Sequence, residues 1–178
     1  DRAGTGAPRT LVFLGSLDWR PNLEAVRWFL RGSWPLVRAA VPDARFLVAG
    51  SNPPAGLEAS VAGEGVRFVG RVADAREFLA SGAGMVVPLL SGGGIRVKIL
   101  EAMALGVPVV STSLGAAGID AAHGSEILVA DGPEALAEAC VSLLSDRERA
   151  VSFGKAGRKR VLAEFDADAV ARRLLDLL

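Results

Sequence analysis

The sequence has one cysteine, one histidine and no excess of charge of either sign in its 178 residues. Cys140 has no second cysteine to pair with, and its place in an apolar run predicts a small buried hydrophobic residue rather than a reactive thiol. No second histidine and no nearby cysteine accompany His123, so it is predicted to be a surface loop residue and gives no support for a metal site. Twenty basic and twenty acidic side chains cancel, which argues against binding to nucleic acid or an anionic membrane.

Long apolar runs are also missing. None reaches the roughly 20 residues of a membrane span, and the N-terminus has no signal-peptide pattern. We therefore expect a soluble, cytoplasmic chain, with peripheral attachment to a membrane left open for the full-length protein. The chain does not begin with Met, and residues 1–9 show no periodicity, so these residues are expected to be the remnant of an interdomain linker.

Two common enzyme motifs are absent. Only Gly15 follows the first expected strand, without a G-x-G-x-x-G fingerprint, which argues against a nicotinamide-dependent dehydrogenase. Ser91, Ser111 and Ser113 lack a G-x-S-x-G elbow and a nearby histidine, which argues against a hydrolase triad.

Short, continuously apolar runs alternate with helix-length amphipathic segments, as is typical of a parallel sheet covered on both faces. We predict one α/β domain over residues 10–178, a doubly wound parallel sheet of about six strands with helices on both faces, like half of a Rossmann fold. The expected strands are residues 10–15, 45–50, 66–70, 84–88, 107–111 and 126–129. The expected helices are residues 22–40, 57–62, 75–81, 95–105, 133–144, 146–162 and 167–177.

Local signals refine the helices. Proline disfavours helical geometry at the preceding residue, so Trp34 and Pro35 are expected to break the first helix. Four residues stand where helix N-caps belong, Asp74, Asp131, Ser145 and Asp166. The three tryptophans, Trp19, Trp28 and Trp34, are expected to be packing residues.

The loop after the fourth expected strand carries three glycines, Gly92 to Gly94. Ligands of doubly wound sheets bind at the carboxyl ends of the strands, and glycines at the start of a helix let a phosphate or diphosphate approach the backbone. On a helical projection Glu101 shares a side with Gly94 and Lys98, where its carboxylate can accept hydrogen bonds from ribose hydroxyls. The alternative is a surface ion pair between Lys98 and Glu101, worth roughly a few tenths of a kcal/mol. The local sequence leaves both interpretations open.

Residues 91–111 (SGGGIRVKILEAMALGVPVVS) resemble the donor-binding motif of the group 1 glycosyltransferases, retaining enzymes of the GT-B fold. Five further segments resemble the same family in the same order: residues 13–22 (FLGSLDWRPN), 28–29 (WF), 42–50 (PDARFLVAG), 66–74 (VRFVGRVAD) and 115–118 (GAAG). The resemblance extends from Thr10 to Leu178. We therefore expect the C-terminal, donor-binding domain of such an enzyme.

The resemblance implies roles for the glycine loop and its helix. Glu101 would hold the ribose hydroxyls, and the backbone at Gly93, Gly94 and Ile95 would meet the diphosphate and the sugar. The family motif has two glutamates separated by seven residues, and Gly93 stands in place of the first. A subgroup with three glycines in this loop shows the same departure, so transferase activity remains compatible with it.

Other donor-binding candidates follow from the same resemblance. Many relatives carry an Arg and a Lys in the loop after the first strand, which here contains Gly15, Ser16 and Arg20. Arg20 is either a cation that offsets the charge of a leaving diphosphate or a solvated loop arginine. Lys98 and Arg96 are further candidate cations, both expected to lie inside the helix, and Lys98 is preferred because it shares the face of Glu101. In the family, the backbone after the third strand pairs with the base, and this turn is Gly70, Arg71 and Val72.

These expectations converge on a domain that binds a UDP- or GDP-linked sugar and orients it for transfer, with retention, to an acceptor held by an N-terminal domain outside this chain. No cofactor and no obligatory metal are expected, because positive groups replace the metal in the GT-B architecture. No catalytic residue is assigned, and the isolated chain is expected to be monomeric and inactive in transfer. Two alternatives stay open, half of a GT-B sugar-nucleotide epimerase and a non-catalytic nucleotide-sugar-binding or assembly module.

Overall fold

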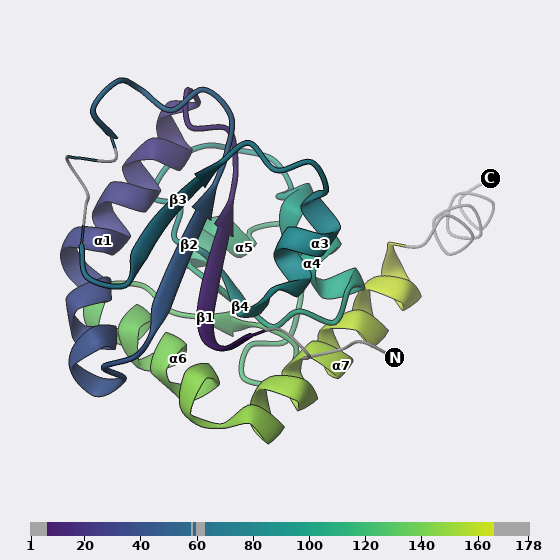
Figure 1. The fold of residues 1–178 in the computed structure, drawn as a ribbon. Helices are drawn as coiled ribbons and strands as arrows, with labels where there is room; N and C mark the ends of the chain where they lie inside the picture. Colours follow the sequence, from purple (N-terminus) through teal and green to yellow (C-terminus); the bar gives the residue numbers. More distant parts are fainter. Residues whose placement is uncertain (1–6, 58, 60–62, 166–178) are drawn as a thin grey trace.

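The computed structural model describes residues 7–57, 59 and 63–165 (Figure 1). Its strands form a single parallel sheet in the order β3-β2-β1-β4-β5-β6. The strands are β1 (Ala7–Leu14), β2 (Arg45–Ala49), β3 (Val66–Gly70), β4 (Gly82–Val87), β5 (Val109–Ser111) and β6 (Leu128–Val129). The sheet confirms the predicted doubly wound fold, and its order reverses direction between β1 and β4.

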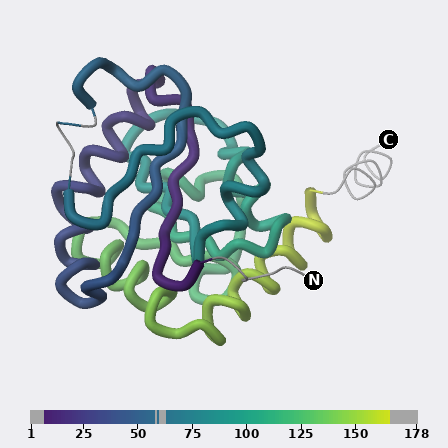
Figure 2. The backbone as a smooth tube through the Cα atoms, in the orientation of Figure 1, coloured from purple at the N-terminus to yellow at the C-terminus, as the bar shows by residue number. Residues whose placement is uncertain are grey.

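Helices cover both faces of this sheet, as Figures 1 and 2 show. On one face lie α1 and α6, and on the other α3 and α4, while α7 contributes to both layers. The helices are α1 (Arg20–Ala40), α3 (Ala75–Ala80), α4 (Val97–Ala104), α5 (Ser113–Ala116), α6 (Pro133–Ser145) and α7 (Arg147–Glu164). Within the described residues, none of them combines the length and apolarity needed to cross a membrane.

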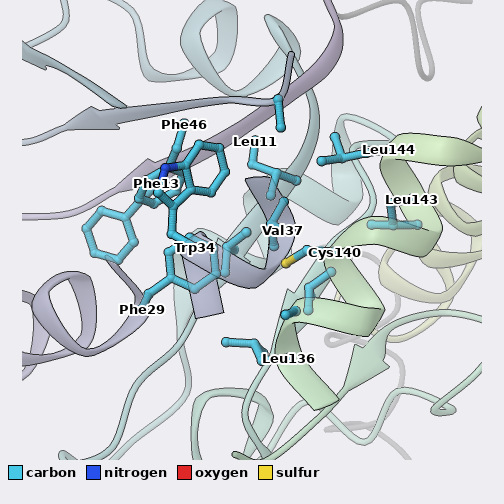
Figure 3. Packing of buried hydrophobic residues seen from close by; sticks show 14 of the residues in the cluster. Leu11, Phe13, Phe29, Trp34, Val37, Phe46, Leu136, Cys140, Leu143 and Leu144 are labelled. Carbon is cyan, nitrogen blue, oxygen red and sulfur yellow. The ribbon is translucent and has the colours of Figure 1, made fainter. Parts of the chain in front are cut away.

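The layer between the sheet and α1 is built around aromatic rings (Figure 3). Phe46 of β2 packs against Phe29 and Trp34 of α1, with ring centroids 4.8 and 5.6 Å apart. The Trp34 indole also donates a hydrogen bond to the Glu64 carbonyl (3.0 Å). Cys140 of α6 is fully buried in the same layer, as predicted, and burial raises the pKa of its thiol.

The opposite layer is mainly aliphatic and carries the helix of the glycine loop. Ile99, Ala102 and Met103 of α4 pack against Met85 of β4, and all four are buried. This packing fixes the rotation of α4 about its axis, so the residues on its remaining face are presented at the carboxyl edge of the sheet.

Packing overrides one local prediction. Proline was expected to end the first helix near Trp34, but α1 continues through Pro35 to Ala40. The buried side chains of Phe29, Trp34 and Val37 lie on both sides of the proline and dock the helix onto the sheet. A helix interior tolerates the missing N–H of proline only where such packing outweighs its cost of about 3 kcal/mol.

Several boundaries also differ from the sequence prediction. Asp74 caps α3 as predicted, accepting hydrogen bonds from the N–H groups of the first turn. The prediction was wrong for Asp131 and Ser145, because Gly132 and Asp146 are the caps of α6 and α7. The strand β1 begins three residues before the expected Thr10, and the short helix α5 was not predicted. Asp166 and the helix expected at 167–177 lie outside the described residues, as does most of the helix expected at 57–62.

Candidate functional site

The loops that follow β1 and β4 meet at the carboxyl edge of the sheet, where the strand order reverses. Neighbouring strands that send their helices to opposite faces leave a crevice at this point, the usual ligand site of a doubly wound sheet. The loop after β4 is braced from below, because the buried Thr112 hydroxyl donates to the Leu89 carbonyl (2.6 Å). The glycine loop therefore starts from a fixed backbone.

Asn22 of α1 joins the two loops. Its amide nitrogen donates to the Ser16 carbonyl (2.9 Å), and its amide oxygen accepts a hydrogen bond from the Lys98 ammonium of α4 (2.8 Å). Asn22 is buried and lies directly over Gly15, where a Cβ would come within 2.6 Å of the amide nitrogen. Gly15 is thus needed for the packing of Asn22, a physical role that the sequence alone did not indicate.

The Lys98 ammonium lies over the ring of Phe13, 4.7 Å from its centroid. Burial against β1 lowers the pKa of Lys98 to about 8, and the charge of Arg96 adds to this effect. Both causes disfavour the charged form of Lys98. An anion bound nearby would favour it, so this position suits a ligand that carries negative charge.

Arg96 is not inside the helix, as the sequence analysis supposed, but is the residue that precedes its first turn. Its side chain is only 7% exposed. One guanidinium nitrogen donates to the carbonyls of Gly93 and Gly94, the latter at 2.8 Å, and the guanidinium lies 5.8 Å from the centroid of the Trp19 ring. Sequence reasoning missed this role, although the spacing of two and three residues between Arg96 and the glycines was the signal that could have found it.

The three glycines differ in what they require. Gly92 and Gly94 have positive φ angles of 101° and 81°, which favour glycine, whereas Gly93 is not in this region. A Cβ at Gly93 or Gly94 would meet nothing within 4 Å. Open space therefore adjoins the backbone at the expected position of the diphosphate.

Glu101 lies on the exposed side of α4 and forms neither a hydrogen bond nor an ion pair with another described residue. The surface pair with Lys98 that the sequence left open is not formed, because Lys98 donates to Asn22 instead. Ile95 is 49% exposed beside Gly118. The carboxylate of Glu101 is thus available to an external donor group.

A second concave region lies at the carboxyl ends of β1, β2 and β3. It brings together Gly15, Ser16, Arg71 and Val72. The Ser16 hydroxyl donates to Asp18 (2.5 Å), and the hydrogen bonds from Ser16 and Asn52 hold the pKa of the Asp18 carboxyl below its usual value. The N–H of Gly50 donates to the Gly70 carbonyl (2.9 Å), which holds the turn after β3 against the end of β2.

Trp19 and Arg20, the N-cap and the first residue of α1, differ in what they contact. The Arg20 guanidinium forms an ion pair with Glu24 one turn along α1 (2.6 Å), and its side chain is largely exposed. Trp34 is buried, as expected of a packing residue, whereas Trp19 is 41% exposed and packs on the guanidinium of Arg96. Of Arg20 and Lys98, the two cations preferred from the sequence, only Lys98 is therefore enclosed in the crevice.

Among the described residues no group of three or more His, Cys, Asp or Glu side chains is arranged to hold a metal ion. His123 is exposed and accepts a hydrogen bond from the N–H of Val129 through its Nδ1 (3.0 Å). The positive charges enclosed at the crevice are Arg96 and Lys98. The arrangement can bind an anionic group through the Lys98 ammonium and the open backbone of the glycine loop, with the charge of Arg96 held beneath that loop.

The family model for glycosyl transferases group 1 matches residues 8–146. A GDP-mannose-dependent alpha-(1-6)-phosphatidylinositol monomannoside mannosyltransferase of Mycobacterium tuberculosis is 41% identical over 54% of this chain and 24% of its own length. A GDP-mannose-dependent monoacylated alpha-(1-6)-phosphatidylinositol monomannoside mannosyltransferase of Corynebacterium glutamicum is 34% identical over 81% of this chain and 41% of its own length. The chain thus covers less than half of either mannosyltransferase.

Among solved structures, the C-terminal domain of the group 1 glycosyl transferase LpcC from Francisella tularensis has a similar fold. The TM-score is 0.70 at 18% identity, and the match covers 93% of this chain and 88% of that domain. The likeness supports the fold over nearly the whole chain.

The enclosed ammonium of Lys98 gives a prediction for stability. Its pKa of about 8 lies below the ordinary 10.5, so between these values the unfolded chain binds this proton more tightly than the native chain. The contribution of Lys98 to the free energy of unfolding must then rise with pH across this window, by up to about 3 kcal/mol.

Urea unfolding of the wild type and of Lys98→Met at pH 7.5 and pH 10 measures this contribution. The free energy of unfolding of the wild type minus that of the variant should be larger at pH 10 than at pH 7.5. The titration of Cys140 and of the other lysines is common to both chains and cancels in this difference. Equal differences at the two pH values would show that the Lys98 ammonium is solvated in the native state.

Proposed function

The chain belongs to the group 1 glycosyl transferases, and we propose that it is the half of such an enzyme that binds a nucleoside-diphosphate sugar. The observation that carries this proposal is the pair of enclosed cations, Arg96 and Lys98, beside an open glycine loop at the point where the strand order reverses. A diphosphate is the part of the donor that such a site fits.

Each part of the donor has a proposed place. The diphosphate and the sugar lie against Gly93, Gly94 and Ile95, with the Lys98 ammonium neutralising negative charge. The ribose hydroxyls donate to the free carboxylate of Glu101, which lies one turn beyond Lys98. The base lies in the concave region between Gly15, Ser16 and the turn at residues 70–72, where backbone groups pair with its edge. Arg20 is left out of this assignment, because its charge is engaged by Glu24.

The proposed donor is GDP-mannose, since both mannosyltransferases named above depend on it. A UDP-linked sugar is the alternative. Backbone pairing at residues 70–72 accepts either base, so nucleotide binding is tested with both GDP and UDP.

In the proposed reaction the bond between the anomeric carbon and the diphosphate breaks while negative charge develops on the leaving phosphate. In this proposal the Lys98 ammonium and the N–H groups of the glycine loop face that charge before the bond breaks, so they stabilise the transition state with little reorganisation. The acceptor attacks with retention of configuration and is held by a second domain across the crevice. We assign no acceptor-side base within this chain.

Nucleotide binding to the isolated chain tests the donor assignment. Thermal shift and calorimetric titration with GDP, UDP and ADP, and with their sugar conjugates, should identify one preferred base, because a ligand that binds only the native state raises the unfolding temperature. Glu101→Gln preserves shape but removes the charge that strengthens hydrogen bonds from ribose. It should weaken binding of the preferred nucleotide by about 1–3 kcal/mol. Unchanged affinity would exclude Glu101 as the ribose ligand.

The glycine loop allows a matched pair of variants. Gly93→Val adds a branched side chain in open space at a backbone angle that other residues adopt, so the folded stability should stay close to that of the wild type. Gly94→Val adds the same side chain at a φ of 81° and should lower the stability as well, by roughly 1–2 kcal/mol.

Both variants should lose nucleotide affinity if the diphosphate lies against this loop. Calorimetric titration together with urea unfolding separates the two effects. Normal affinity in a stable Gly93→Val variant would place the phosphates elsewhere.

Transfer itself is expected to need the second domain. Bringing donor and acceptor together in one cleft is worth roughly 7–11 kcal/mol of barrier lowering, so the isolated 178-residue chain should bind the donor without acceptor-dependent turnover. A longer protein that also contains the acceptor domain should form the glycoside with retained anomeric configuration, detected by NMR of the product. Release of free sugar that does not depend on an acceptor would instead support the epimerase alternative. Robust transfer by this chain alone would contradict the two-domain proposal.

A further inference from the structure

Arg96 is a buried charge without a carboxylate partner among the described residues. The three ion pairs of the described chain involve other residues, Arg9, Arg20 and Arg38. Its contacts are two backbone carbonyls and the face of Trp19, and its Nε has no hydrogen-bond partner. A buried guanidinium that is only partly satisfied costs free energy, so its place beside the glycine loop calls for a function.

The two carbonyl contacts determine how the glycine loop faces the crevice. A trans peptide unit is planar, with its C=O and N–H pointing in opposite directions. Since the carbonyls of Gly93 and Gly94 are turned toward Arg96, the N–H groups of the same two peptide units, those of Gly94 and Ile95, are turned away from it. Neither of these N–H groups donates to another described residue, and the space beside both glycines is open.

Arg96 also acts on Lys98. Other elements near the ammonium contribute no free carboxylate among the described residues: α1 contributes Asn22, and β1 contributes the Phe13 ring. Asp18 is engaged by Ser16 and Asn52 and Glu24 by Arg20, while Glu101 lies exposed on α4 itself. Arg96 is the one charged group that shifts the pKa of Lys98. Two positive charges are therefore held together without internal compensation, and Arg96 is one of the two causes of the lowered pKa of Lys98.

We propose that Arg96 is the positioning residue of the diphosphate site: it holds the glycine loop with the N–H groups of Gly94 and Ile95 facing the ligand, and it makes Lys98 take up a proton when the ligand binds. This inference rests on the proposed function of the site. Arg96 itself stays beneath the loop, covered by Trp19. The bound diphosphate supplies the negative charge that no described carboxylate provides to Arg96 and Lys98. Ligand binding, the conformation of the glycine loop and the protonation of Lys98 are therefore coupled.

Titration calorimetry of GDP and UDP at pH 8.5, in two buffers with different ionisation enthalpies, measures the protons taken up. The wild type should take up more than about half a proton per nucleotide, because Lys98 is largely neutral at this pH before binding and charged afterwards. Lys98→Met should take up none. Lys98→Arg should keep the charge at all pH values and also take up none, although it still binds.

Variants of Arg96 separate its two roles. Arg96→Met removes both, so the affinity should fall on the order of 10- to 100-fold and the proton uptake should shrink, as the pKa of Lys98 returns toward its ordinary value. Arg96→Lys keeps the charge, but its side chain is one atom shorter and lacks the Nη1 that donates to both carbonyls, so the affinity should fall while the proton uptake persists. Arg147→Met, at an exposed position on α7, is the charge-matched control and should behave as the wild type.

The outcomes are distinguishable. If the wild type binds nucleotide without proton uptake, or if Arg96→Met binds as tightly as the wild type, the inference is wrong while the proposed function stands. The wild-type measurement does not depend on whether the variants fold. If neither GDP nor UDP binds the wild type at millimolar concentration, both the inference and the proposed function are wrong.

Discussion

The hydrogen bond between Lys98 and Asn22 is the contact on which the crevice depends. It links α4 on one face of the sheet to α1 on the other, across the point where the strand order reverses. The same asparagine holds the loop after β1 through the Ser16 carbonyl, and it fits only because Gly15 has no side chain. The conformations of both loops are thereby coupled, so a change in either is transmitted to the ammonium between them.

Two enclosed positive charges make this edge of the domain costly to fold, and the rest of the molecule must compensate. The compensation comes from the two layers of buried side chains, aromatic beneath α1 and aliphatic beneath α4. The aromatic layer also keeps α1 continuous through Pro35, which places Asn22 at the first turn of a rigid helix. Stability is thus concentrated in the layers, while the carboxyl edge of the sheet is left electrostatically strained in favour of an anionic ligand.

Much of this could be predicted from the sequence. The strands are continuously apolar because both of their faces are buried, and the position of the glycine loop and of Glu101 follows from the strand that precedes them. What could not be predicted depends on contacts between distant residues. Trp19 packs on the guanidinium of Arg96, and Asn22 accepts a hydrogen bond from Lys98. The partners of the hydrogen bond are 76 residues apart in the sequence. Local patterns carry no information about such pairs, so Arg96 was expected inside the helix and the contact between Trp19 and its guanidinium was not predicted. The continuation of α1 past Pro35 was missed for the same reason.

The burial of Cys140 makes the reactivity of its thiol a measure of local opening of the domain. The thiol is enclosed between α6 and the sheet, and its pKa is raised by that burial, so an alkylating reagent in solution reacts only with molecules whose α6 layer has opened. It is the only cysteine of the chain, which makes any such modification unambiguous. A ligand that binds the crevice only in the closed form slows this alkylation, so the alkylation rate of Cys140 measures ligand occupancy at a distance from the crevice.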